Sequence, residues 1–241
     1  LDGKLLLSPG LRYDRNEATT SPDSLYVLGN PGVARPVDYD ESELTLKFGA
    51  LIQITDSLSA FGRYSEGFRA PPFDDVNLGF TNFLGGYKTI SAPDLTSETS
   101  EGVEVGLRFL SENAEISVTA FSTEYSDFIA SAGSGHCPTA YRQFGCFDPV
   151  DGFLVFQSEN ISKVSIDGLE LRFLIDLSVM GLDNFGVRGA IAYADGEDED
   201  TGEPLDTIQP LTAVIGVSYD SANGRWGGQL VWTGVRAKAV S

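Results

Sequence analysis

Few residues of the chain belong to the types that carry out catalysis or hold metal ions. The chain has one His, His136, and two Cys, Cys137 and Cys146, among 241 residues. Structural zinc sites use several Cys and His ligands, and hydrolytic catalysis pairs a nucleophile with a His, so this composition argues against both. We therefore expect no enzyme centre, no metal site and no resident cofactor.

The charge balance restricts the partners that the chain can bind. Asp and Glu number 35 against 16 Lys and Arg, which gives a formal net charge of −19 and a pI near 4.2. Such an acidic chain repels the phosphates of nucleic acid, so we expect no nucleic-acid partner. Hydrophobic residues make up 41% of the chain, too many for a disordered protein. No apolar run approaches the roughly 18 residues of a membrane-spanning helix.

The elements that must position any site are strands, because apolar and polar residues alternate along most of the chain. Leu44, Leu46 and Phe48, for example, alternate with Thr45 and Lys47. A period of two residues places the two sets on opposite faces of a strand. The predicted strands lie near residues 4–13, 43–54, 58–66, 98–109, 114–128, 153–175, 184–195, 210–220 and 225–236.

Short and long connections alternate strictly between these strands. The short ones carry the Asn, Asp and Gly chemistry of hairpin turns. The long ones cover roughly 14–42, 67–97, 129–152 and 196–209. An antiparallel meander then has all its long loops at one end, and Tyr and Phe gather at the strand ends. This pattern is typical of an all-β, transmembrane, antiparallel up-and-down β-barrel with short periplasmic turns and long extracellular loops.

The charged strand residues fall on one side of the alternation. They are Glu104, Arg108, Glu170, Arg172 and Arg188, and the opposite row is uncharged over the same stretches. An outward charge at mid-bilayer costs roughly 2–4 kcal/mol, so we expect the uncharged row to face lipid and the charged row to line a lumen. A soluble sheet with one solvated face has the same pattern. A soluble or surface β-sandwich adhesin therefore stays an alternative, as does a passive porin.

Several motifs occur in a fixed order along the chain. Phe68-Arg69-Ala70-Pro71 is followed by Ala92-Pro93-Asp94-Leu95, then by Asn160-Ile161-Ser162 with Ile166-Asp167-Gly168-Leu169-Glu170, and finally by 204–210. Together they resemble the barrel of TonB-dependent outer-membrane receptors, most closely the haem, haemoglobin and transferrin receptor branch. The first two motifs match the FRAP box and approximate the NPNL box of that branch. The resemblance covers essentially the whole chain.

The resemblance implies a barrel of about 22 strands closed by an N-terminal plug. Residues 1–241 would then be a later part of the barrel, without the plug, its Ton box, the first strands and the last strands. It also implies active uptake of haem, a haem protein or a ferric siderophore across the outer membrane of a Gram-negative bacterium. The TonB–ExbB–ExbD complex would act through the plug, lipid and lipopolysaccharide would surround the barrel, and the charged row would contact the plug or line the path.

The same resemblance nominates ligand-binding residues. In the haem branch a His between the two boxes is the usual iron ligand, but residues 72–92 contain none. Tyr87 is the residue there that could ligate ferric iron through a phenolate, and His136 lies in the next long loop. The candidates are Phe68, Arg69, Ala70, Pro71, Tyr87, Pro93, Asp94, Leu95 and His136. For Tyr87, packing within the loop is the favoured interpretation.

Arg69 has two possible roles. Its guanidinium could meet an anionic ligand such as a haem propionate or a ferric siderophore. It could instead pair with Asp74 or Asp75 and hold the loop. Because Pro71 and Pro72 stiffen the chain there, pairing is the expected role.

Cys137 and Cys146 are nine positions apart in one predicted extracellular loop. An oxidising environment favours a disulfide between them, whereas a metal or redox pair would need CxxC spacing or further ligands. We predict the disulfide, which in the chain-entropy model stabilises the loop by roughly 2–3 kcal/mol.

Residues 195–206 hold seven carboxylates in twelve residues. Several oxygen ligands could bind Ca²⁺, but Glu197 and Glu199 do not fit the EF-hand spacing. We expect a solvated, self-repelling acidic loop. Divalent cations that bridge it to lipopolysaccharide phosphates remain an open alternative.

Overall fold

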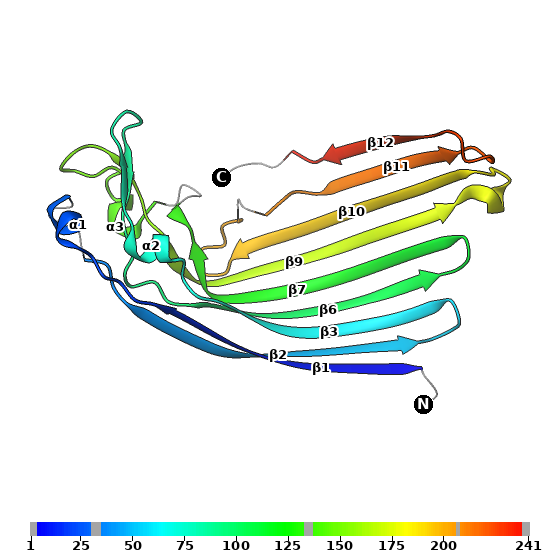
Figure 1. The fold of residues 1–241 in the computed structure, drawn as a ribbon, viewed down its shortest axis with the longest axis horizontal. Helices are drawn as coiled ribbons and strands as arrows, with labels where there is room; N and C mark the ends of the chain where they lie inside the picture. Colours follow the sequence, from blue (N-terminus) through cyan, green and yellow to red (C-terminus); the bar gives the residue numbers. More distant parts are fainter. Residues whose placement is uncertain (1–3, 30–34, 133–136, 206–207, 238–241) are drawn as a thin grey trace.

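A computed structural model describes residues 4–29, 35–132, 137–205 and 208–237 (Figure 1). Within them, nine long antiparallel strands form one sheet in the order β1-β2-β3-β6-β7-β9-β10-β11-β12, which confirms the predicted all-β meander. The strands are β1 Leu5–Ala18, β2 Tyr39–Gln53, β3 Leu58–Arg69, β6 Glu98–Leu110, β7 Ala114–Ala130, β9 Glu159–Asp176, β10 Phe185–Asp198, β11 Thr212–Asp220 and β12 Gly227–Val235. Long connections lie at one end of the sheet and short ones at the other.

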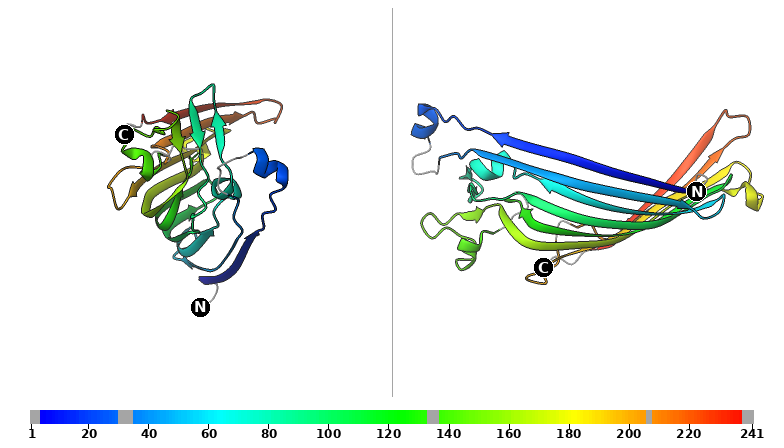
Figure 2. Two further views of the ribbon diagram at one scale, coloured as in Figure 1. Left: turned by 90° about the vertical axis from the view of Figure 1, so that its left-hand side faces the viewer. Right: turned by 90° about the horizontal axis from the view of Figure 1, so that it is seen from below.

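The sheet is a single curved layer, like part of the wall of a cylinder (Figure 2). Strands β1 and β12 form its two edges, and the sheet does not close over the described residues. In the views of Figure 2, no second layer from the described part of the chain covers either face of its long strands. This arrangement differs from a β-sandwich, in which two sheets pack face to face.

One face of the sheet carries an uncharged row that crosses all nine strands. Its cross-strand neighbours are Leu5, Ile52, Ala60, Leu107, Val118, Leu171, Ile191, Ala213 and Gly234. Large side chains on this face, such as Leu107, remain half exposed. A continuous exposed apolar face of this kind suits contact with lipid.

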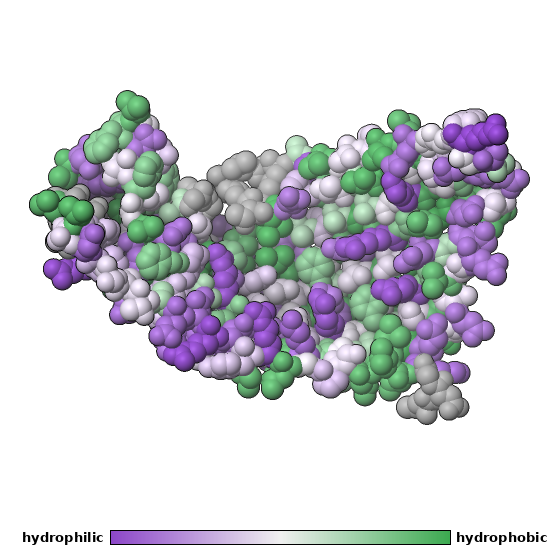
Figure 3. All heavy atoms as spheres, viewed as in Figure 1, coloured by the Kyte–Doolittle hydropathy of each residue, from purple (hydrophilic) through white to green (hydrophobic). Residues whose placement is uncertain are grey.

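The other face is concave and polar. Its rows include Arg63 opposite Glu104, and Ser117 between Arg108 and Arg172. Figure 3 looks onto this concave face and shows hydrophilic residues interspersed among apolar ones over the strands. The two faces therefore differ in the way that a barrel wall between lipid and an aqueous lumen requires.

Three aromatic rings each pack over a glycine on the neighbouring strand. The cross-strand pairs are Phe61 with Gly106, Phe121 with Gly168, and Phe173 with Gly189. A Cβ atom at any of these glycines would overlap the paired ring and meet a backbone carbonyl. The glycines thus let each ring lie across the neighbouring strand, a device that also pins strand register.

The long loops contain helices and a second, smaller sheet. The helices are α1 Ser24–Gly29, α2 Phe73–Asn77 and α3 Thr139–Arg142, and the 3₁₀ helix η2 Leu177–Met180 lies in a connection at the opposite end. The small sheet joins β4 Phe80–Asn82, β5 Tyr87–Thr89 and β8 Leu154–Phe156. The prediction of one strand over 153–175 is wrong at its start, because β8 leaves the long sheet and pairs in parallel with β5.

The connections 70–97 and 131–158 are called the loop module below. The most buried apolar side chains of the described chain lie where this module meets β7 and β9. They are Val76, Ala92, Ile129, Val155 and Val164. Core-like packing is therefore concentrated at the base of the loop module, while the middle of the long strands exposes its apolar residues.

Candidate functional site

An ion pair at the end of β3 holds the base of the loop module. Arg69 Nη1 lies 3.4 Å from Glu98 Oε2, and the same carboxylate oxygen accepts a hydrogen bond from the Ile129 amide at 2.9 Å. Glu98 is only 7% exposed. Arg69 therefore holds the loop, but through Glu98, its cross-strand partner on β6, and the expected pairing with Asp74 or Asp75 is wrong. Phe68 precedes Arg69 on β3, and Ala70 and buried Pro71 lead away from it.

A second clamp holds the return of the loop to the sheet. Asn160 accepts a hydrogen bond from the Thr96 amide at 2.9 Å and donates to the Thr96 carbonyl at 3.1 Å. It also donates to the carbonyl of Asp127, at 2.7 Å, a residue whose φ of 54° interrupts regular β7 geometry. The second and third motifs of the sequence are thereby joined, with Pro93, Asp94 and Leu95 directly before the clamp.

A third clamp connects the loop module to the first long loop. Asn77, at the end of α2, accepts from the Val37 amide at 2.6 Å and donates to the Val37 carbonyl at 3.2 Å. Its side chain is 2% exposed. The buried side-chain amide of Asn77 thus satisfies both backbone groups of residue 37, as a neighbouring strand would do inside a sheet.

The two halves of the loop module are tied together by Lys88. Its Nζ lies 2.5 Å from Asp148 Oδ2 and 2.8 Å from Asp151 Oδ2. The parallel pairing of β5 with β8 runs beside this ion pair. Segments that are about sixty residues apart along the chain therefore form one unit.

The predicted iron contacts in the loop module have different outcomes. Tyr87 lies on β5, and its ring is within 6.3 Å of Phe80 and 6.1 Å of Phe156 between centroids. This shows the packing contact expected of Tyr87, while iron ligation stays a prediction. His136 lies outside the described residues. The predicted disulfide between Cys137 and Cys146 is present, with 5.6 Å between the Cα atoms.

The Lys88 cluster predicts acid sensitivity of the loop module. Burial lowers the pKa of Lys88, but its hydrogen bonds to the two carboxylates outweigh this effect and raise the pKa. The hydrogen bond from Lys88 holds the pKa values of Asp148 and Asp151 below the usual range. In the unfolded chain these carboxylates have a pKa of about 4, and in the folded loop the pKa is lower. Their contribution to stability is therefore complete above about pH 4 and is lost as the pH falls through the pKa of the folded state.

We therefore expect hydrogen exchange of residues 86–90, corrected for intrinsic rates, to be constant from about pH 5 to 8 and to accelerate below about pH 4. The measurement uses the full-length receptor. Lys88→Met should exchange faster at neutral pH and show no such acid transition. An identical acid transition in the variant would contradict the role of the cluster.

Four of the five predicted lumen residues lie together. Glu104, Arg108, Glu170 and Arg172 surround one hollow of about 320 Å³ on the concave face. Arg63 Nη2 donates to Glu104 at 2.5 Å, and Arg172 Nη2 donates to Glu170 at 2.9 Å. Arg108 forms no ion pair within the described part of the chain, so its charge on this hollow is not balanced by a direct partner there.

Arg188 lies apart from this group. Its Nη2 donates to Gln229 Oε1 on β12 at 2.6 Å, on the same face but nearer the short-turn end. The concave face thus carries a mixed patch of charges on β6 and β9, and a separate arginine on β10 whose partner, Gln229, is neutral.

The acidic segment after β10 forms a tight hairpin. Asp198 Oδ1 accepts from the amides of Asp200 and Thr201 at 2.9 and 3.2 Å. Within the described residues, no group of three or more His, Cys, Asp or Glu side chains is placed to hold a metal ion. Through its two hydrogen bonds the side chain of Asp198 stabilises the turn, while the solvated, self-repelling acidic loop stays a prediction.

Sequence reasoning did not identify the residues that organise the loops. Glu98, Asn77 and the cluster of Lys88 with its two carboxylates were all missed. Lys88 offered a signal, because it is the sole basic residue between 70 and 97. Glu98 offered no such signal, because the long connection 70–97 separates β3 from β6 and no short turn fixes the register that places it opposite Arg69.

The fold and the site together define a class of protein. A single curved sheet with an apolar outer face, a polar concave face and elaborate loops at one end is a segment of a transmembrane β-barrel wall. None of the helices in the described ranges is long and apolar enough to cross a membrane.

Residues 1–240 match the family described as TonB dependent receptor-like, beta-barrel. The chain belongs to this family, whose members are receptors of the Gram-negative outer membrane.

Curated relatives agree with the branch that the sequence motifs indicated. The chain is 26% identical to hemoglobin-haptoglobin utilization protein B of Neisseria meningitidis serogroup C, over 98% of this chain and 30% of that protein. It is 27% identical to lactoferrin-binding protein A of Neisseria meningitidis serogroup B, over 96% of this chain and 24% of that protein. The chain thus spans less than a third of these relatives. Their names describe binding and utilization proteins, not enzymes.

Solved structures share the fold. The copper transporter OprC superposes with a TM-score of 0.71 at 18% identity, over 96% of this chain and 33% of that one. The hemophore receptor HasR of Serratia marcescens, in complex with HasA and heme, gives a TM-score of 0.66 at 16% identity, over 95% of this chain and 41% of that one. The predicted barrel architecture is confirmed.

Proposed function

We propose that the protein containing this chain is an outer-membrane receptor that imports an iron-bearing ligand by TonB-coupled transport. The observation that carries the proposal is that hydrogen bonds and an ion pair join the first three sequence motifs at the base of one loop module, above a polar, charged wall. Haem, a haem protein or a ferric siderophore would be the cargo, without a resident cofactor. The named relatives that bind haemoglobin–haptoglobin or lactoferrin support this ligand class.

The mechanism would consist of binding and gating, without covalent chemistry. The loops would capture the ligand, and Arg69, which is half exposed beside its Glu98 partner, would still offer donors to an anionic group. The TonB–ExbB–ExbD complex would act on a plug inside the barrel. Arg108 and the neighbouring ion pairs of Glu104, Glu170 and Arg172 would contact that plug or line the opened path. The domain assignment, a later barrel segment without plug, stays a prediction.

Growth under iron limitation tests the proposed function. A strain that carries the full-length receptor is supplied separately with haem, haemoglobin, iron-loaded lactoferrin or ferric siderophores. We expect growth on at least one source to require both the receptor gene and TonB. Equal growth without the receptor on every source would contradict the proposal.

Arg172 allows a test of the lumen wall. Arg172→Glu replaces the partner of Glu170 with a second carboxylate beside it, so the plug-facing charge changes while the loops stay intact. We expect ligand binding at the cell surface to change less than twofold. Uptake should fall roughly fivefold, the effect of about 1 kcal/mol.

Arg225→Glu supplies the control for this variant. This substitution reverses the same charge, but in an exposed turn away from the hollow. Uptake by the Arg225 variant should therefore be unaffected. Wild-type uptake by the Arg172 variant would remove this residue from the lumen function.

A further inference from the structure

The ladder between β2 and β3 stops partway along both strands. β2 pairs with β1, and β3 pairs with β6, up to their loop-side ends. The pairing of β2 with β3, however, ends at Lys47 opposite Ser65. Within the described chain, residues 39–46 and 66–69 are therefore strand segments that pair on one side only, and the boundary between them is called the seam below. In the right-hand view of Figure 2, β1 and β2 diverge from the other strands toward the loop end.

Side-chain carboxylates take the place of the absent ladder in the seam. The amide of Leu46 donates to Glu66 Oε2 at 2.8 Å. The amide of Leu44 donates to Glu43 Oε1 at 3.1 Å. Even-numbered amides of this strand face β3, as the Ile54 amide does at the short-turn end. The two carboxylates thus occupy the donors that a longer ladder would use next.

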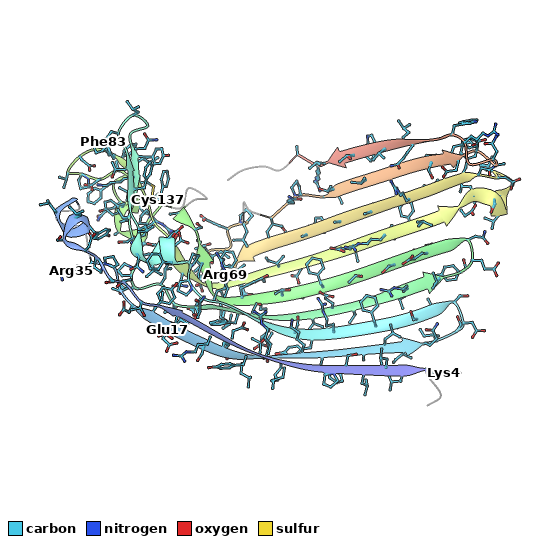
Figure 4. The ribbon with its side chains drawn as sticks, in the orientation of Figure 1. Lys4, Glu17, Arg35, Arg69, Phe83 and Cys137 are labelled. Carbon is cyan, nitrogen blue, oxygen red and sulfur yellow. A yellow bond between two sulfur atoms is a disulfide. The ribbon has the colours of Figure 1, made fainter. Side chains whose placement is uncertain are left out.

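The seam is held at both of its ends. Below it lies the last ladder pair, and above it the clamp between Asn77 and Val37 joins the loops on its two sides. Figure 4 labels Arg69 on the β3 side and Glu17 on the β1–β2 side at this end of the sheet. A hollow of about 360 Å³ lies at the seam, and its lining includes Glu43, Thr45, Glu66 and Gly67.

The sequence suits a longer ladder in the same register. Four further pairs would place Leu44 opposite Phe68 on the outer face and Glu43 opposite Arg69 on the concave face. Apolar pairs and pairs of opposite charge both stabilise neighbouring strands. Glu98 already lies opposite Arg69 on β6, so one guanidinium would stand between two carboxylates. Its five N–H donors are enough for both.

We propose that the seam is a movable joint of the barrel wall, in which β2 and β3 alternate between this split state and a paired state whose ladder extends to Glu43 and Arg69. In the paired state the hollow closes, and Glu43 joins the row of Arg69 and Glu98 at the base of the loop module. The wall and that base therefore change together. The inference goes beyond the proposed function, because it does not depend on the ligand that the receptor carries.

Disulfide trapping in the full-length receptor tests for the paired state. Leu44→Cys with Phe68→Cys places two thiols directly opposite each other in that state, with Cα atoms about 5.5 Å apart, which is within disulfide range. Ser42→Cys with Phe68→Cys is the matched control, because Ser42 would lie opposite Ala70. We expect a mild oxidant to cross-link the first pair at least tenfold faster than the control, measured by mass spectrometry of the linked peptides.

Glu66→Ala gives a second test that needs no added cysteine. The substitution removes the side-chain acceptor of the Leu46 amide, so the backbone carbonyl of residue 66 can take its place only if β2 and β3 pair. We expect hydrogen exchange of this amide to slow at least threefold as the ladder extends. Glu66→Gln keeps an oxygen acceptor and should exchange within twofold of wild type.

Each other outcome overturns the inference. It fails if the two cysteine pairs are oxidised at equal rates, since this would mean disordered fraying, or if neither pair is oxidised. It also fails if the Leu46 amide in Glu66→Ala exchanges as in wild type or faster, because the carboxylate would then be a static cap. Equal slowing in Glu66→Gln would assign the effect to charge and would equally overturn it.

Discussion

Gly168→Ala is expected to lower the free energy of unfolding of the full-length receptor by about 3 kcal/mol, the upper range for overpacking. A Cβ atom at residue 168 would overlap the ring of Phe121 and press on the carbonyl of Tyr193. The carbonyl belongs to the ladder between β9 and β10 and cannot retreat without disturbing it, and the ring can move only by giving up its place over residue 168. The amount of receptor that folds in the outer membrane should fall accordingly.

Gly62→Ala provides a matched control on β3. A Cβ atom there would meet only the carbonyl of Glu104, at an ordinary 3.8 Å. Urea unfolding in detergent and the mobility of unheated samples on gels would compare the two variants. If Gly168→Ala were as stable as Gly62→Ala, the packing of the Phe121 ring would not require a residue without a side chain at position 168.

Glu98→Ala should open the base of the loop module. The substitution leaves the buried amide of Ile129 without its acceptor and Arg69 without its partner. An unsatisfied buried donor costs about 1–3 kcal/mol, so exchange of the Ile129 amide should accelerate about 30-fold. Hydrogen exchange of a peptide that covers residues 126–130 would measure this.

Glu98→Gln separates the hydrogen bond from the charge. Its side-chain oxygen can still accept from Ile129, and only the ion pair with half-exposed Arg69 is lost. Exchange should therefore stay within threefold of wild type, the range of a surface ion pair of about 0.5 kcal/mol. Equal acceleration in both variants would assign the effect to charge and contradict the hydrogen-bond argument.

The strands were predictable because each crosses an environment that differs on its two faces. Apolar and polar residues alternate along the part of each strand whose outer face is apolar, and this alternation predicts all nine strands. It fails beyond that part, where both faces meet water. β1 was expected to end near residue 13 but continues to Ala18, where Arg15 pairs with Asp40 of β2 at 2.8 Å. The ladder continues there although the sequence pattern has stopped.

The loop contacts were much less predictable. Lys88 and Asp148 are distant in sequence, and β5 and β8 are three residues each, too short for a periodic signal. Arg69 shows the same difficulty at short range, because nearby Asp74 and Asp75 looked like its partners until strand register brought Glu98 opposite. The disulfide was predictable because the described chain offers Cys137 and Cys146 no alternative thiol.

The parallel pairing of β5 with β8 has a consequence for chimeric receptors. Connections 70–97 and 131–158 share one small sheet, one ion-pair cluster and one buried base. If only one of the two connections were transplanted between homologues, it would have to pack against a connection with a different sequence, and the shared contacts would be lost. The two connections must therefore be exchanged together, and they are expected to diversify together across the lineage as one inherited unit.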